Sequence, residues 1–272
     1  MKMFTCIEIL PENEGILTKI YEKIRPPEPQ RQYVQLKGAT PFLRLNVREN
    51  NIDWCKISAL LTKDERVVLK SDAVSLPEHI SLTPYVPRRL PLLMMFRALC
   101  RVLKKADKPR HINISVFDKD GFLVNEIEKT VPLVRNASVY TEKISEYFYR
   151  ASLITRESGM SIKINEYESA QKPAEIIIAD EYLPCMKEAE LVFLADKSVM
   201  AYNTVTGEGI FMEEEYKILK SQSIDDLMFA SALFERNNAH FWAERDFLSL
   251  SLSEKAITHH QLSELVCRSA GE

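Results

Sequence analysis

The stretch Ala174-Glu175-Ile176-Ile177-Ile178-Ala179 decides the fold class of this chain. Its last four residues form an unbroken apolar run, which is typical of a strand that is buried on both faces in a parallel sheet under helices. Further strands are predicted at residues 112–117, 138–141, 161–165 and 190–195. A helix is predicted over residues 142–158, because apolar side chains recur there at helical spacing and Gly159 follows at the position that favours glycine.

These elements predict an α/β protein with two domains. Residues 1–108 form a mixed α+β region, and residues 109–272 form a degenerate Rossmann-like domain with a mostly parallel sheet and a helical C-terminus. Only eight residues, 166–173, connect two of the proposed strands, whereas a parallel crossover normally needs about a dozen. The connection is therefore either a single tight turn of helix, or these two strands are not simple neighbours.

The composition excludes several classes of protein. The 272 residues include 36 basic and 39 acidic side chains, which gives a net charge of −3 and the balance of a water-soluble globular protein. The five cysteines are scattered without a Cys-x-x-Cys pair, which is typical of reduced thiols. Neither a secretory leader nor a segment that could span a bilayer is recognised. We therefore expect a cytoplasmic protein that makes no contact with membranes.

Glycine is scarce, with seven residues in the whole chain. Backbones that wrap closely around phosphates need glycine, because a Cβ atom blocks the approach. Neither the G-x-G-x-x-G fingerprint nor a P-loop occurs, and Gly207-Glu208-Gly209 is not continued by a third glycine. The sequence therefore identifies no cofactor.

One motif suggests phosphoryl-transfer chemistry. Residues 116–124 read Val-Phe-Asp-Lys-Asp-Gly-Phe-Leu-Val, an apolar strand that runs into Asp-x-Asp-Gly. This motif resembles the first motif of the haloacid-dehalogenase superfamily, in which the first Asp attacks a phosphoryl group and the second serves as acid and base. The resemblance implies those roles for Asp118 and Asp120, and phosphate-binding roles for Thr141 and Lys172. It also implies a Mg²⁺ ion, with Asp118, Asp180 and Glu181 as candidate ligands.

The same motif has a structural interpretation. The resemblance covers about 70 residues, and Phe122 stands where the family usually has Thr. The turn 118–121 between the segments 112–117 and 122–127 is also typical of a β-hairpin, and we favour this interpretation. A Mg²⁺-dependent phosphatase is the alternative.

A basic helix raises a further alternative. Residues 91–106 have helical periodicity, and the polar face carries Arg97, Arg101, Lys104 and Lys105. The face is either a dock for nucleic acid or another anion along residues 91–108, or a solvated helix surface. The second interpretation is favoured because the chain as a whole is acidic, so nucleic acid is not an expected partner.

The function predicted from the sequence is that of an α/β protein which binds a ligand or a protein partner without catalysis. Open α/β sheets bind ligands at the carboxyl ends of their strands. Thr141, Asn165, Asp180 and Asp196 lie at such ends and are the predicted ligand-binding residues. The partner is a small molecule or a protein, and self-association is compatible with the sequence.

Overall fold

The computed structural model describes most of the chain. The described residues are 4–10, 28–35, 40–48, 52–62, 65–69, 80, 82–106, 111–169, 174–197, 201–220, 224–237 and 239–269. Contacts between residues divide the chain into two compact units, Met1–Pro87 with Ile210–Glu244 and Arg88–Gly209 with Arg245–Glu272. This division falls 21 residues before the expected boundary at 108/109, since helix α3 (Arg89–Lys105) packs on strands of the second unit.

The first unit contains a five-stranded sheet. Its strands are β1 (Phe4–Leu10), β2 (Gln30–Val34), β3 (Phe42–Arg48), β4 (Arg66–Val68) and β5 (Thr83–Pro84), in the order β2-β3-β1-β4-β5. Its helices are α2 (Trp54–Leu60), α5 (Glu214–Leu219), α6 (Asp226–Asn237) and the short 3₁₀ helix η7 (His240–Glu244). Phe4 stacks on Phe42, and Phe229 of α6 packs edge-on against both rings, so α6 closes the core of this sheet.

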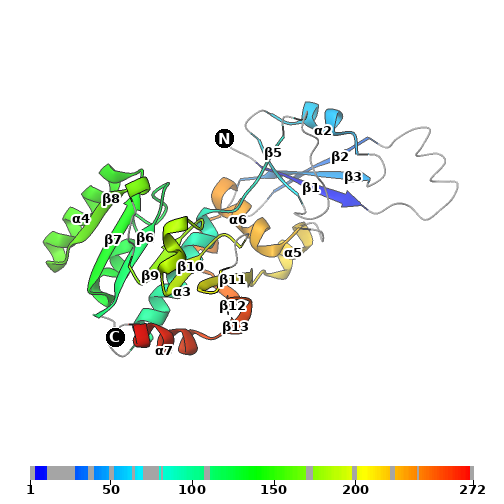
Figure 1. Ribbon diagram of the computed structural model, residues 1–272. Helices are drawn as coiled ribbons and strands as arrows, with labels where there is room; N and C mark the ends of the chain where they lie inside the picture. Colours follow the sequence, from blue (N-terminus) through cyan, green and yellow to red (C-terminus); the bar gives the residue numbers. More distant parts are fainter. Residues whose placement is uncertain are drawn as a thin grey trace. The chain divides into compact units, whose positions relative to one another are not determined.

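The second unit contains an eight-stranded sheet (Figure 1). Its strands are β6 (Asn113–Phe117), β7 (Asn136–Thr141), β8 (Ile162–Glu166), β9 (Ile176–Ala179), β10 (Leu191–Leu194), β11 (Thr204–Ile210), β12 (Phe247–Leu252) and β13 (Lys255–Ile257). The order β8-β7-β6-β9-β10-β11 is parallel throughout and corresponds to the 3-2-1-4-5-6 order of dinucleotide-binding folds. All four residues of β9 are buried. The predicted α/β fold with a mostly parallel, Rossmann-like sheet is therefore confirmed.

Helices cover the apolar face of this sheet. The register places Ile114 and Val116 of β6 beside Ala137 and Val139 of β7, and all four are buried. Helix α4 (Ile144–Ser158) packs against β8, whereas α3 contacts β9, β10 and α7 (His259–Ser269). Within the described ranges, no helix has both the length and the apolar character that crossing a membrane requires.

The connection from β8 to β9 leaves little room for a helix. Strand β9 lies three strand positions away from β8, which is about 14 Å across the sheet. Because the two strands are parallel, the chain must also return from the end of β8 to the start of β9, about 16 Å along the strand direction. The diagonal between the two strand ends is therefore about 21 Å. The ten Cα-to-Cα steps from Glu166 to Ile176 would cover only about 15 Å if they were helical. The nine residues 167–175 are therefore too few for a crossover helix. The strands that flank the link are not neighbours, as the second sequence interpretation required, and the link begins with one turn of 3₁₀ helix, η5 (Tyr167–Ser169), as the first proposed.

Candidate functional site

The carboxyl edge of the eight-stranded sheet gathers most of the predicted site residues. Phe117 of β6 lies opposite Tyr140 of β7 and Ala179 of β9. One position further along the three strands are Asp118, Thr141 and Asp180, which therefore form one row. Asn165 of β8 lies opposite Tyr140, and the backbone N–H of Asp196 donates to the carbonyl of Asp180 (3.0 Å). The structure thus brings the residues predicted from distant segments to a single edge.

Asp118 is an internal group of this edge. Its side chain is fully buried, and its carboxylate accepts hydrogen bonds from the N–H groups of Phe122 (2.8 Å) and Leu123 (2.7 Å). The hydroxyl of Tyr147, on α4, donates the third bond (2.6 Å). Burial raises the pKa of Asp118, and the bonds from Tyr147 and the two N–H groups act against that rise. Asp118 therefore ties the loop after β6 to helix α4.

The β-hairpin expected at this loop is wrong. Residues 122–126 form turns, and the 3₁₀ helices η3 (Ile127–Lys129) and η4 (Val131–Leu133) follow, while β6 pairs in parallel with β7 and β9. The sequence 118–121 does turn the chain, and Gly121 has a positive φ of 77°. A turn of this composition serves equally well before a second hairpin strand or before a compact loop, so the local residues did not distinguish the two structures.

The loop after β6 also differs from a phosphate cradle. In sheets of this strand order, the first strand leads through a glycine-rich turn to a helix, and the free N–H groups there bind pyrophosphate. In this chain, the N–H groups of Phe122 and Leu123 bond to Asp118 instead, and turns and 3₁₀ helices follow the strand. An internal carboxylate thus takes the hydrogen bonds that a bound phosphate would accept.

Thr141 is likewise engaged within the protein. Its hydroxyl oxygen accepts from the N–H of Lys143 (2.9 Å) and the hydroxyl lies 3.5 Å from the carbonyl oxygen of Lys119. Asp120 is exposed, and Lys172 lies outside the described residues. Over the described ranges, no three acidic, His or Cys side chains are grouped as they would be to hold a metal ion, so the structure adds no support for the Mg²⁺ that the phosphatase alternative requires.

Asp180 is the carboxyl group with the most unusual titration at this edge. Burial, followed by the nearby negative charge of Glu181, raises the pKa of Asp180 to about 6. Its Oδ1 accepts from the N–H of Glu181 (3.0 Å), and the Glu181 carboxylate accepts from the hydroxyl of Tyr167 (3.2 Å). The ammonium group of Lys119 lies 5.6 Å from the centre of the Tyr167 ring. Asp180 is therefore able to gain or lose a proton near neutral pH.

The basic stripe of the predicted helix lies on α3, most of which is buried. Arg101 forms an ion pair with Asp246 (2.5 Å), whereas Lys104 and Lys105 are exposed in the last turn. Lys108, at the end of the predicted stripe, is outside the described residues. One of the cations that would meet an anionic partner is thus already neutralised within the unit.

A polar trough of about 420 Å³ lies on the face of β6, β7 and β8 opposite to α4. Ser115, Ser138 and Lys163 are side-by-side neighbours in the register and form its central row. The other lining residues are Asn113, Ile114, Asn136, Ala137, Tyr140, Ser161, Ala174 and Glu175. Together they offer amide, hydroxyl, ammonium and carboxylate groups.

The hydrogen bonds around the trough engage Ser115 of the central row and leave the side chains of Ser138 and Lys163 available. The side chain of Asn136 donates to that of Asn113 (2.7 Å), and the N–H of Ala174 donates to Ser115 Oγ (2.8 Å), which anchors the link. In the described part of the chain, Ser138 and Lys163 have no side-chain hydrogen bond or ion pair. The sequence prediction missed this site, although polar residues alternate with apolar ones in Asn113-Ile114-Ser115 and again in Asn136-Ala137-Ser138.

Comparison with known proteins gives no family. Neither a protein-family model nor a curated protein sequence matches the chain. Among solved structures, the chain is similar to L-tryptophan dehydrogenase from Nostoc punctiforme (11% identity, TM-score 0.32, 99% of this chain and 80% of that one). It is also similar to quinate dehydrogenase from Corynebacterium glutamicum in complex with NAD (9% identity, TM-score 0.31, 90% and 98%). Similarity at this level carries no statement about activity.

Proposed function

We propose that the eight-stranded unit binds a small hydrophilic ligand in the polar trough, and that it takes no dinucleotide at the loop after β6. The row Ser115–Ser138–Lys163, in which Ser115 is buried, Ser138 half-buried and Lys163 exposed, is the observation that carries this proposal. The function is that of a binding module, in agreement with the absence of a glycine-rich fingerprint in the sequence.

The chemistry of the trough defines the ligand class. Asn and Ser side chains both donate and accept hydrogen bonds, so they suit a ligand with several hydroxyl or amide groups. Lys163 supplies a positive charge at one end of the central row and is suited to one carboxylate or phosphate. A volume of about 420 Å³ lies within the range of small-molecule sites. The expected ligand is therefore a small hydroxylated molecule with one anionic group.

Calorimetric titration with glucose, gluconate and glucose 6-phosphate tests this proposal. The two anionic probes share most of their hydroxyl chain with glucose, so we expect both to bind at least tenfold more tightly than glucose. Lys163→Ala removes that preference, whereas Arg156→Ala, at the end of α4, leaves it unchanged. Ser138→Leu fills the centre of the trough and abolishes binding of all three probes. The proposal is wrong if none of the probes binds, or if Lys163→Ala binds them as the wild type does.

A second candidate position is the carboxyl edge predicted from the sequence, with Thr141, Asn165, Asp180 and Asp196. Asp180, whose pKa is raised to about 6, lies on β9 beside β6, at the point where the strand order reverses and ligands of open sheets bind. With Glu181 next to it, Asp180 suits a ligand that donates hydrogen bonds. If Asp180→Asn lost binding of the sugar probes while Lys163→Ala bound them as the wild type does, the ligand site would be the carboxyl edge.

A further inference from the structure

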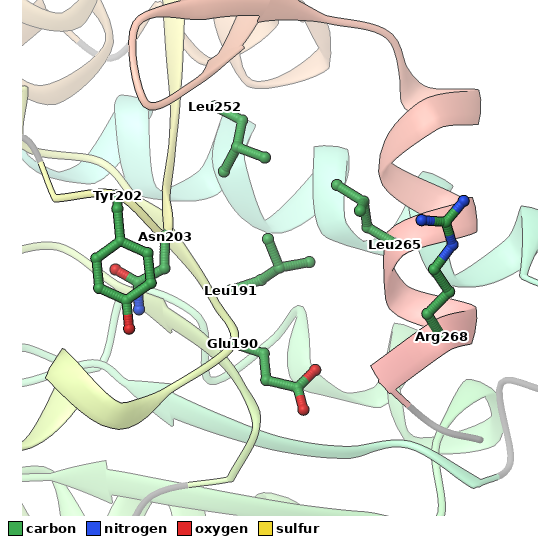
Figure 2. Close-up of a pocket in the computed structure, with 7 residues that line it drawn as sticks. All are labelled: Glu190, Leu191, Tyr202, Asn203, Leu252, Leu265 and Arg268. Atoms are coloured by element: carbon green, nitrogen blue, oxygen red, sulfur yellow. The ribbon is translucent and has the colours of Figure 1, made fainter. Parts of the chain in front are cut away.

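A second pocket, of about 330 Å³, lies at the amino ends of β10 and β11, opposite to the carboxyl edge of the sheet (Figure 2). It is formed where β10 and β11 begin, where β12 ends, and along α7. Its lining residues are Glu190, Leu191, Tyr202, Asn203, Leu252, Leu265 and Arg268. None of them lines the polar trough, so this pocket is a separate site.

The pocket combines an apolar centre with two opposite charges. Figure 2 shows Leu191, Leu252 and Leu265 between Tyr202 on one side and Arg268 of α7 on the other, with Glu190 below. Neither Glu190 nor Arg268 forms an ion pair with any described residue. The two charges therefore stand apart on different walls, and an aliphatic surface lies between them.

Asn203 provides a buried polar group at the same pocket. Its side chain is 2% exposed, and its amide nitrogen donates to the carbonyls of Ala189 (2.5 Å) and Met186 (3.4 Å). Its Oδ1 is buried and has no hydrogen-bond partner among the described residues. Buried acceptors in native proteins are nearly always paired, so this oxygen indicates a missing donor from a ligand or an ordered water.

An adjoining cavity of about 280 Å³ extends the apolar surface along α7. It shares Leu252, Leu265 and Arg268 with the first pocket and adds Ala256 and Ile257, together with the polar side chains of Lys255, Gln261 and Glu264. The aliphatic wall of the first pocket thus continues to Ala256 and Ile257.

We propose that this pocket binds a small zwitterion whose ammonium and carboxylate groups are separated by an aliphatic chain. Glu190 pairs with the ammonium group, Arg268 pairs with the carboxylate, and the three leucines contact the methylene groups between them. A ligand with one charge at each end matches two oppositely charged side chains that have no ion-pair partner among the described residues and that flank an apolar floor. A molecule with only one of the charges leaves one wall unmatched.

Titration calorimetry of the full chain with 6-aminohexanoate, hexylamine and hexanoate tests this inference. We expect 6-aminohexanoate to bind at least tenfold more tightly than either singly charged probe. Arg268→Ala should lower its affinity to that of hexylamine and leave hexylamine unchanged, whereas Glu190→Gln should lower it to that of hexanoate and leave hexanoate unchanged. Glu188→Gln, an exposed neighbour on η6 (Pro184–Glu188), serves as the control and should retain full affinity.

Two results would overturn the inference. The first is the absence of 6-aminohexanoate binding at 20 mM in the wild type. The second is binding that both Arg268→Ala and Glu190→Gln retain. Both substituted side chains are exposed, so the variants should fold, and an unchanged melting temperature verifies this. The two sites share no lining residue, so Lys163→Ala must leave 6-aminohexanoate binding intact. Each proposal is tested with its own probes, and the failure of one leaves the other standing.

Discussion

Replacing Asp180 by Asn should make the protein more stable at neutral pH. The pKa of Asp180 is raised from 3.8 to about 6, so the folded state disfavours its charged form. Each unit of pKa corresponds to about 1.4 kcal/mol, and the difference therefore amounts to roughly 3 kcal/mol of destabilisation by the ionised carboxylate. An Asn side chain retains an oxygen that can accept from the N–H of Glu181, so the local hydrogen bond survives.

The sign of the pH dependence follows from the raised pKa. Below pH 3.8 the carboxyl group of Asp180 is protonated in the folded and the unfolded protein, so it does not lower the free energy of unfolding. As the pH rises through 6, the destabilisation by the ionised carboxylate reaches its full value. Asp180→Asn should therefore match the wild type near pH 4 and exceed its free energy of unfolding by up to about 3 kcal/mol at pH 7.5.

Urea denaturation followed by circular dichroism at pH 4, 5, 6 and 7.5 measures this difference. Asp120→Asn, which removes an exposed carboxylate from the loop after β6, serves as the control for the loss of one negative charge. A difference between Asp180→Asn and the wild type that stays constant from pH 4 to 7.5, or a variant less stable at pH 7.5, would refute the reasoning.

Three further predictions concern the loop after β6. Tyr147→Phe removes a buried hydrogen bond to the carboxylate of Asp118 and should lower the free energy of unfolding, measured in urea, by about 1.5–3 kcal/mol. Asp118→Asn should lower it further. An unchanged free energy of unfolding in both variants would contradict the connection between this loop and α4. Gly121→Ala should lower the melting temperature more than Gly159→Ala. Both glycines have a positive φ, but only a Cβ added at Gly121 would lie 2.9 Å from a Lys143 carbon. Equal losses in melting temperature would show that this contact is easily relieved. Hydrolysis of p-nitrophenyl phosphate with Mg²⁺ should stay at background in the wild type, and Mg²⁺-dependent turnover that Asp118→Asn abolishes would restore the phosphatase alternative.

The sequence predicted the fold class because that information is local. The run 176–179 indicates burial on both faces, and the helix over 144–158 ends at Gly159 as expected. The carboxyl ends of parallel strands meet at one edge, which is why Thr141, Asn165, Asp180 and Asp196 were expected there. That Asp118 joins Thr141 and Asp180 could not be predicted, because it depends on the place of β6 between β7 and β9.

The missed features depend on distant parts of the chain. Whether the turn 118–121 leads into a second strand is decided by the partners that β6 finds in β7 and β9. The trough is formed by residues of β6, β7 and β8, which are brought together by the strand order. No local pattern of residues contains that order.

The short link between β8 and β9 makes the composition of one sheet face dependent on the length of one loop. Nine residues are too few to supply a crossover helix, and in the row Ser115–Ser138–Lys163 the last two side chains are open to water, whereas Ser115 is buried. An insertion of a dozen residues would supply enough chain for a helix, but that helix would bury a lysine and a second serine. Descendants of this chain could therefore gain a helix over this row only by changing the loop and the row together, which makes the open row resistant to single mutations.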